Sequence, residues 1–152
     1  MAFQYRLESL LRLQRGVERQ EENRLLTCAA RINGLRAALE RWEQARLAKK
    51  AAVLSTWEDG TSGAALQVEM EWDAAAMERQ KQIRIELREA EQARHKQMQV
   101  YQRERQKREM LDSLRERQQS EYVNEERRNT QQNLDDAFLM RMVYSQEAKV
   151  AE

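Results

Sequence analysis

Few residues in this chain have types and spacings that could carry out chemistry. The sequence contains one histidine, His95, and one cysteine, Cys28, which are too few to build a zinc site. Asp135 and Asp136 are adjacent, so on a helix they point in different directions and do not form an acid–base pair. The segment Gly60–Gly63 lacks the further glycine and the Lys-Ser/Thr ending of a phosphate-binding loop. We therefore expect no catalytic residue, no cofactor and no metal site, and we do not expect an enzyme.

The composition predicts long helices that would have to position any functional residue. Of 152 residues, 35% are charged and 41% are apolar, with no proline and only four glycines, which is typical of coiled coils. A net charge of +1 argues against disorder and against a dedicated nucleic-acid surface, which needs a strongly basic face. No run of about 18 apolar residues could span a membrane. We interpret the Arg- and Leu-rich start as mature structure rather than a targeting helix.

One strong break divides the sequence into two helical segments. Residues 58–63 (EDGTSG) combine two glycines with turn-forming residues. Gly60 suits a helix C-cap because glycine takes a positive φ without steric cost, and Thr61 or Ser62 can cap the next helix. We expect a first helix over about residues 3–58, a turn over 59–63, a second helix over about 64–145 and a tail over 146–152. All of these belong to a single coiled-coil hairpin over residues 1–152.

A heptad repeat predicts that the first segment packs along one seam, which includes Cys28 as a small core residue. Polar members weaken the N-terminal part of this seam, and Leu10, Leu13 and Val17 offer an alternative register there. A second, less apolar seam follows the break at Ile83, Leu87, Ala90, Met98, Tyr101, Leu111, Leu114 and Tyr122. The members of the first seam are Leu7, Leu11, Gln14, Glu18, Glu21, Leu25, Cys28, Ile32, Leu35, Leu39, Trp42, Arg46, Lys49 and Val53.

A short turn between two seams predicts an all-α fold, an antiparallel two-helix coiled coil. Folding about Thr61 brings Leu25 near Met98 and Leu11 near residue 112, so the first helix ends opposite about residue 120. The rest of the second helix overhangs. One of its faces carries five apolar residues that we interpret either as a binding surface or as a surface that self-associates or covers Phe3 and Tyr5. These residues are Leu134, Phe138, Leu139, Met142 and Val143.

Three tryptophans lie near the turn. Trp42 fits the first seam, whereas Trp57 and Trp72 flank the turn at similar distances and could pack across it. Alternatively, Trp72 faces a partner together with Met70 and Met77, because Trp and Met are enriched at binding surfaces.

Three motifs resemble the flagellar export protein FliJ family. They are residues 7–11 (LESLL), 107–111 (KREML) and 131–138 (QQNLDDAF). The family pattern is a Leu-rich N-terminal helix, a long charged helix, and a Glu/Arg/Gln run that closes on a Leu-Asp-Asp/Glu-Ala box. The resemblance covers nearly the whole chain.

The resemblance implies a non-enzymatic part of the bacterial flagellar type III export apparatus, which serves motility. Such proteins look like the central stalk of rotary ATPases. They promote ring assembly of the hexameric export ATPase FliI, contact the export gate protein FlhA, and are linked to FliH and to the escort of export chaperones. The implied location is cytoplasmic and peripheral to the inner-membrane gate. The alternatives are a stalk of a virulence-type injectisome, a purely structural coiled-coil scaffold and, more distantly, a nucleic-acid-binding rod.

The uncovered apolar face and the resemblance together predict two binding ends. The sequence departs from some relatives at Ala74–Ala76, where the family has bulkier residues. The ring-binding end would consist of Phe3, Leu7, Leu11, Leu134, Phe138, Leu139 and Met142. The gate-binding end would consist of Met70, Trp72, Ala76, Met77 and Ile83.

Overall fold

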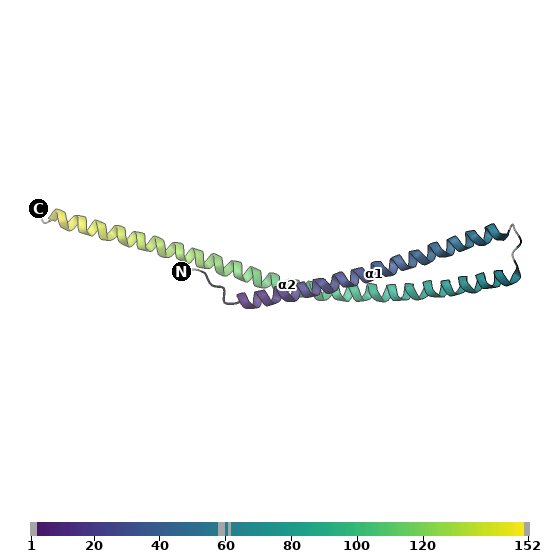
Figure 1. Cartoon of the computed structure of the whole chain (residues 1–152). Coiled ribbons are helices and arrows are strands. Elements are labelled where there is room, and N and C mark those ends of the chain that lie inside the picture. Colours follow the sequence, from purple (N-terminus) through teal and green to yellow (C-terminus); the bar gives the residue numbers. More distant parts are fainter. Residues whose placement is uncertain (1–2, 58–59, 61, 151–152) are drawn as a thin grey trace. The chain divides into compact units, whose positions relative to one another are not determined.

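The chain is an all-α helical hairpin, as the sequence predicts (Figure 1). The computed structural model describes residues 3–57, 60 and 62–150, with side chains up to Tyr144. Helix α1 spans Glu8–Trp57 and helix α2 spans Gly63–Val150. The described residues contain no strand.

Both helices differ slightly from their predicted bounds. α1 begins at Glu8 rather than near residue 3 because the preceding segment docks through a side chain. The Tyr5 hydroxyl donates a hydrogen bond to the Leu111 carbonyl at 3.1 Å, and the Tyr5 carbonyl accepts one from the Glu8 amide at 3.1 Å. Glu8 also places a negative charge in the first turn, where the helix dipole favours it. α2 continues to Val150, so residues 146–150 belong to the helix and not to a tail.

The turn uses the predicted capping residues where they are described. Gly60 has a φ of 84°, a left-handed conformation that favours glycine, and its amide donates to the Trp57 carbonyl at 3.4 Å. The Ser62 hydroxyl accepts a hydrogen bond from the Ala65 amide at 3.3 Å, which makes Ser62 the N-cap of α2. The other candidate cap, Thr61, lies outside the described residues.

The chain divides into two compact units. We call residues 17–104 the tip unit and residues 1–16 with 105–152 the terminal unit. Each unit contains a stretch of α1 and a stretch of α2.

The tip unit is held by a narrow seam between antiparallel helices. Its fully covered apolar residues are Ile32, Ala76, Ile83 and Ala90, each at most 3% exposed. Gln97 donates hydrogen bonds to the carboxylate and the carbonyl of Glu21, which agrees with the predicted pairing of this region. Every α1 position of the predicted heptad from Glu18 to Val53 is buried or half-buried, and so are the predicted α2 positions from Ile83 to Tyr101.

The terminal unit continues the same pattern. Leu11 is completely buried and Arg15 pairs with Asp112 at 2.9 Å, within one helical turn of the predicted pairing of Leu11 with residue 112. The alternative register is wrong, because Leu10 and Leu13 are 44% and 65% exposed. The docked Tyr5 and the Arg15–Asp112 pair fix the register that centres Leu11 in the seam.

Candidate partner-binding surfaces

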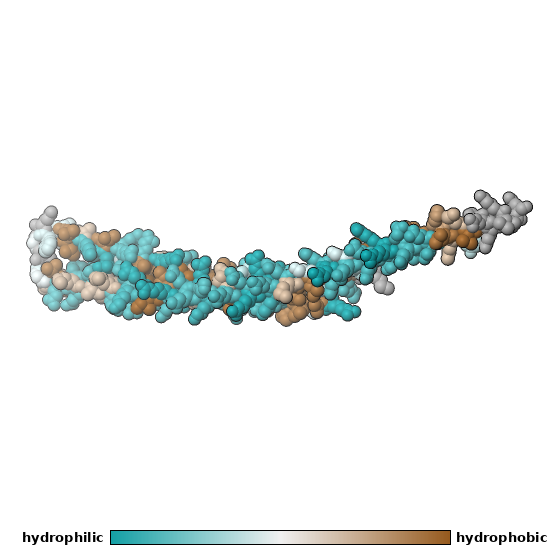
Figure 2. Space-filling model, turned by 180° about the vertical axis from the view of Figure 1, so that it is seen from behind, coloured by the Kyte–Doolittle hydropathy of each residue, from teal (hydrophilic) through white to brown (hydrophobic). Residues whose placement is uncertain are grey.

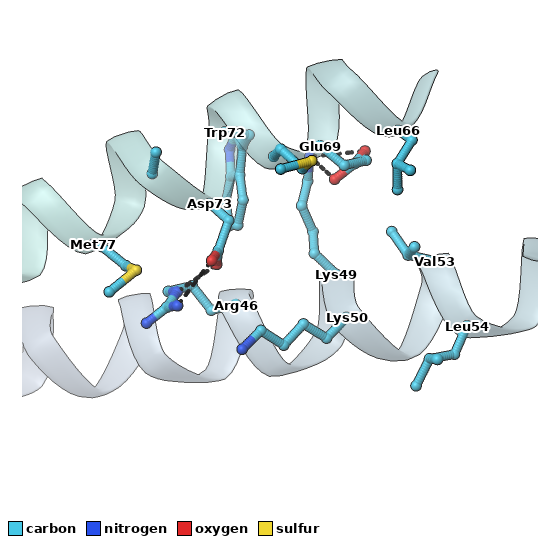
Figure 3. Close-up of a pocket in the computed structure, with 12 residues that line it drawn as sticks. Arg46, Lys49, Lys50, Val53, Leu54, Leu66, Glu69, Trp72, Asp73 and Met77 are labelled. Carbon is cyan, nitrogen blue, oxygen red and sulfur yellow. Dashed lines mark hydrogen bonds and ion pairs between the residues drawn. The ribbon is translucent and has the colours of Figure 1, made fainter. Parts of the chain in front are cut away.

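The hairpin end of the tip unit contains a groove between α1 and α2, which we call the tip groove. It has a volume of about 460 Å³, and its lining is mainly apolar (Figure 3). Figure 3 shows α1 and α2 as its two walls, with charged side chains reaching across between them. The lining residues are Arg46, Lys49, Lys50, Val53, Leu54, Leu66, Glu69, Met70, Trp72, Asp73, Ala74 and Met77.

A two-pronged ion pair joins the walls of the tip groove. The Arg46 guanidinium donates to both carboxylate oxygens of Asp73, at 2.7 and 3.0 Å, and to Gln80 Oε1 at 3.1 Å. The hydrogen bond from Arg46 holds the pKa of Asp73 below its usual range, and the same bond raises the pKa of Arg46. Both groups therefore stay charged. The ion pair gives the charged Arg46 side chain a partner at a seam position that is usually apolar.

A second cross-helix contact holds Trp72 in place. Lys49 Nζ lies 3.2 Å from a carboxylate oxygen of Glu69 and 4.3 Å from the centre of the Trp72 ring, a cation–π distance. The Trp72 and Trp42 ring centres are 6.3 Å apart. The predicted packing of Trp57 across the turn is wrong, because Trp57 is 59% exposed. Trp42 occupies a seam position, and this brings it to Trp72.

The structure divides the predicted gate-binding residues into two groups. Ala76 and Ile83 are 2% and 1% exposed, so their side chains lie in the seam and cannot contact a partner of the folded hairpin. Trp72, Ala76 and Ile83 thus belong to the face of α2 that closes the hairpin. Met70 and Met77 are exposed and line the tip groove.

Sequence reasoning assigned Met70 and Met77 to a binding surface but missed two apolar residues of α1 that also lie outside the seam. Leu47 and Leu54 of α1, and Met70 and Met77 of α2, are each more than half exposed. Within each pair the residues are seven apart, so they share a face of their helix. Lys50 lies on α1 between the two leucines and is exposed; after Arg46, its charge also lowers the pKa of Asp73. The seven-residue spacing within each pair, offset from the seam, was the sequence signal that could have identified these positions.

The C-terminal part of α2 is uncovered in the terminal unit. Every residue from Asn124 to Tyr144 is exposed. We call Leu134, Phe138, Leu139 and Met142 the C-terminal stripe; the first three are 61%, 63% and 59% exposed. Figure 2 shows apolar surface beside the grey C-terminal residues, after a long hydrophilic stretch of the helix.

The predicted N-terminal half of the ring-binding end does not join this stripe. The Phe3 ring packs against Tyr122, with ring centres 5.7 Å apart, and Tyr5 bonds to Leu111. Phe3 and Tyr5 are therefore covered by an earlier part of α2, and the idea that the stripe covers them is wrong. Leu11 is fully buried and Leu7 is half-buried, which makes both of them seam residues.

The residues considered for chemistry lie apart from one another. Cys28 is half-buried in the tip-unit seam, and His95 is exposed on α2 with its Nε2 3.3 Å from Gln99 Nε2. Asp135 accepts a hydrogen bond from the Gln131 amide at 3.0 Å. Within the described part of the chain, no group of three or more His, Cys, Asp or Glu side chains could hold a metal ion. No described helix is long and apolar enough to cross a membrane.

Comparisons with protein-family models, with curated proteins and with solved structures find no match to this chain. The likeness to the FliJ family therefore stays a prediction that rests on the three sequence motifs.

Proposed function

We propose that this chain is a non-enzymatic, stalk-like component of the bacterial flagellar type III export apparatus. In this role its C-terminal stripe enters the hexameric export ATPase FliI and promotes ring assembly, while the tip unit contacts the export gate protein FlhA. FliH and export chaperones are further partners, and the protein works in the cytoplasm beside the inner-membrane gate. The motifs at residues 7–11, 107–111 and 131–138 support this family of functions.

The observation that carries the proposal is the uncovered C-terminal stripe. From Asn124 to Tyr144 the helix has no covered residue, yet Leu134, Phe138 and Leu139 place large apolar side chains on neighbouring positions of one face. Contiguous exposed apolar surface is a feature of protein-binding sites. A single helix that presents such a stripe fits the opening of a ring, where six subunits can surround it.

The gate contact must use residues that the folded hairpin leaves accessible. Met70 and Met77 meet this condition, whereas Ala76 and Ile83 do not. Methionine side chains are unbranched and adapt to different partner surfaces. We therefore assign the gate contact to the Met70 and Met77 side of the tip groove, with Trp72 as its partly covered base.

Stimulation of the cognate export ATPase tests the ring contact. Phe138→Asp places a charge in the middle of the stripe and should abolish most of the stimulation. Asn129→Asp is the matched control, because residue 129 lies half a helical turn away from residue 138 at 100° per residue. If Phe138→Asp stimulates as well as Asn129→Asp does, the ring does not use this surface.

Binding to the cytoplasmic part of FlhA tests the gate contact. Met77→Asp should weaken binding and motility while it spares ATPase stimulation. The control is Val68→Asp, which adds the same charge at an exposed α2 residue that does not line the groove. Equal binding by both variants would remove the tip groove from the gate contact. Failure of both the ATPase and the gate assay for the unmodified chain would favour the structural scaffold instead.

A further inference from the structure

The terminal unit has two uncovered apolar surfaces, one at the C-terminal stripe and one beside the start of α1. We propose that two copies of this chain pair antiparallel through α2, so that the stripe of each copy covers the second surface of the other. This inference concerns the chain by itself and does not rest on the proposed function. It commits to a second copy of the chain as the occupant of both surfaces.

We call the surface beside the start of α1 the shoulder patch. Leu10, Leu13 and Met110 are exposed, and Leu114 is half-buried. At 100° per residue all four lie on the edge of the seam opposite to the ion pair that joins α1 and α2 in this unit. Figure 2 shows apolar surface near the start of α1, set between hydrophilic stretches. The shoulder patch is therefore open to a partner.

A hollow on α2 continues the shoulder patch. It has a volume of about 540 Å³, and its walls include Met110, Leu114 and Arg117. Glu109 also borders it, but the Glu109 carboxylate is held by Arg105 at 2.8 Å. Arg117 is exposed and has no hydrogen-bond or ion-pair partner among the described residues. The hollow thus joins an apolar wall to an unpaired positive charge.

One face of α2 runs through both the shoulder patch and the stripe. Positions that are alternately four and three residues apart share a face of a helix and form the seam of a coiled coil. From residue 110 to residue 142 all positions of this series are exposed except the half-buried Leu114. At 100° per residue they lie within about 60° of one direction. The positions are Met110, Leu114, Arg117, Glu121, Asn124, Arg128, Gln131, Asp135, Phe138 and Met142.

The apolar ends of this face meet when two copies run antiparallel about a two-fold axis. In the register centred on residue 126, Met110 of one copy faces Met142 of the other, and Leu114 faces Phe138. The Phe138 ring then enters the hollow, and a large aromatic side chain in a pocket is a typical anchor of an interface. The axis repeats each contact, so both ends of the pair are covered in the same way.

A charge pair falls into place in the same register. Arg117 of one copy faces Asp135 of the other, and the axis forms this pair twice. Arg117 and Asp135 are about five helical turns apart, so they point in the same direction on α2. Asp135 accepts a hydrogen bond from the Gln131 amide of its own helix, and its exposed carboxylate has no ion-pair partner in the described part of the chain.

Other registers and the parallel orientation lose this match. A shift by one heptad in one direction places Arg117 opposite Arg128, and a shift in the other direction places it opposite Met142. Parallel pairing places Arg117 against Arg117 and Asp135 against Asp135. Each of these arrangements brings like charges together or covers a charge with an apolar side chain, and both are unfavourable.

The middle of the proposed interface is polar. Near the axis lie Glu121, Glu125, Arg127 and Arg128, two residues of each sign, so no net charge builds up there. The hairpin seam of this chain also covers charged residues by pairing them across two helices. We therefore expect the apolar ends to supply the binding energy and the Arg117–Asp135 pairs to fix the register.

Such an interface is isologous, because the same surface is used on both copies, and it closes at two copies. Both stripes and both shoulder patches are covered at once. If the proposed function holds, the ATPase ring and a second copy compete for the same stripe.

The first test uses the purified full chain alone in sedimentation velocity over a range of concentrations. The expected result is a reversible equilibrium between monomer and dimer with no larger species. Arg117→Asp and Asp135→Arg should each weaken the dimer by about tenfold or more, since each places like charges together. Asp136→Arg makes the same change in charge about 100° around the helix and should leave the dimer unchanged. A chain that stays monomeric, or equal losses with Asp136→Arg, overturns the proposal.

Mixing the two charge variants tests whether positions 117 and 135 face each other. Arg117→Asp leaves a copy with two negative charges and Asp135→Arg leaves a copy with two positive charges, so neither variant should pair with itself. Mixed in equal amounts they should form a dimer that contains one copy of each. Absence of this mixed dimer, with circular dichroism of both variants unchanged, would refute the proposed register.

Disulfide cross-linking tests the orientation in a Cys28→Ser background. Glu121→Cys mixed with Gln131→Cys should give a covalent dimer in a glutathione redox buffer, because these positions face each other in the antiparallel pair. Glu121→Cys alone should not cross-link. Cross-linking of Glu121→Cys with itself would show parallel pairing and overturn the proposal.

All three experiments omit the ATPase and the gate, so their outcome is independent of the assays of the proposed function. Measurements of the stability of the single hairpin, including truncation after Asn133, belong at dilutions where sedimentation shows a monomer.

Discussion

Single residues explain how a seam with so many polar members can hold two helices together. Arg46, Lys49 and Glu21 occupy seam positions, and each has a partner on the opposite helix: Asp73, Glu69 and Gln97. The partners keep the charged groups hydrogen-bonded, which removes most of the cost of covering them. The side chain of Gln80 is only partly hydrogen-bonded. Its Oε1 accepts from Arg46, but its buried amide nitrogen has no hydrogen-bond partner in the described structure.

The first prediction is that the stability of the fold depends on pH through Asp73 and Asp112. Hydrogen bonds from Arg46 and, for Asp112, from Arg108 and then Arg15 hold the pKa values of Asp73 and Asp112 below the usual range. A carboxyl whose pKa is lowered by folding stabilises the protein fully above its unfolded value of about 3.9. That contribution is lost as the pH falls through the lower, folded pKa. We expect the free energy of unfolding to be flat near neutral pH and to decline below about pH 4.

Urea unfolding at pH 7 and at stepwise lower pH checks this expectation. Asp73→Asn should be less stable than the unmodified chain at pH 7 and should lose less on acidification. A variant with the same pH dependence as the unmodified chain would mean that the Arg46–Asp73 pair does not stabilise the fold. The exposed Asp136→Asn is the control, because the Asp136 carboxylate lies on the uncovered part of α2.

At the scale of the elements, one heptad register runs along α1 from Leu11 to Val53. Only a few of its members are large and fully covered, namely Leu11 and Ile32, with Ile83 from α2. Stability should therefore depend on very few side chains, and on whether each lies in the seam or beside it.

Alanine substitutions in the tip unit check this dependence. Ile32→Ala should lower the free energy of unfolding by about 2–4 kcal/mol, because a fully covered side chain leaves a cavity. Leu26→Ala should change it by less than about 0.5 kcal/mol, because Leu26 is 62% exposed on the same helix. Chemical denaturation followed by circular dichroism measures both. Similar losses for the two variants would mean that the seam is misplaced.

At the scale of the whole molecule, α2 has two kinds of segment. Up to Val123 it alternates covered and exposed positions, whereas from Asn124 to Tyr144 it is exposed throughout. An isolated helix in water is marginal, so this segment adds helix without adding a packed interface. We expect the part of the chain before it to carry the stability.

Truncation after Asn133 tests this division. The midpoint of thermal unfolding should change by no more than about 2 °C, because every described side chain of the removed segment is exposed. The helical signal should fall only by the share of the missing residues. A large drop in the midpoint would show that the C-terminal residues support the hairpin and are not reserved for a partner.

The sequence by itself determined the all-α hairpin, the position of the turn and the pairing of the helices. The heptad positions Leu25, Ile32 and Leu39 define the seam of the first helix, and a single Gly-containing break defines the turn. Residues at equal distances before and after that break must then lie opposite each other. Helix periodicity and chain connectivity act locally, so the sequence is enough to predict this pairing. The predicted capping roles of Gly60 and Ser62 depend on backbone conformation close in sequence, and they were confirmed for the same reason.

Only the tertiary structure decided which apolar residues are covered. Ala76 and Ile83 have the composition of a binding patch, yet they face α1 and are buried, while Leu47, Leu54, Met70 and Met77 remain exposed. The choice between Trp42 and Trp57 as the neighbour of Trp72 depended likewise on the rotation of one helix against the other. A periodic pattern fixes the residues that share a face, but covering that face requires a second helix at a definite rotation. That rotation is set by contacts between residues far apart in the sequence, such as Arg46 with Asp73 and Tyr5 with Leu111.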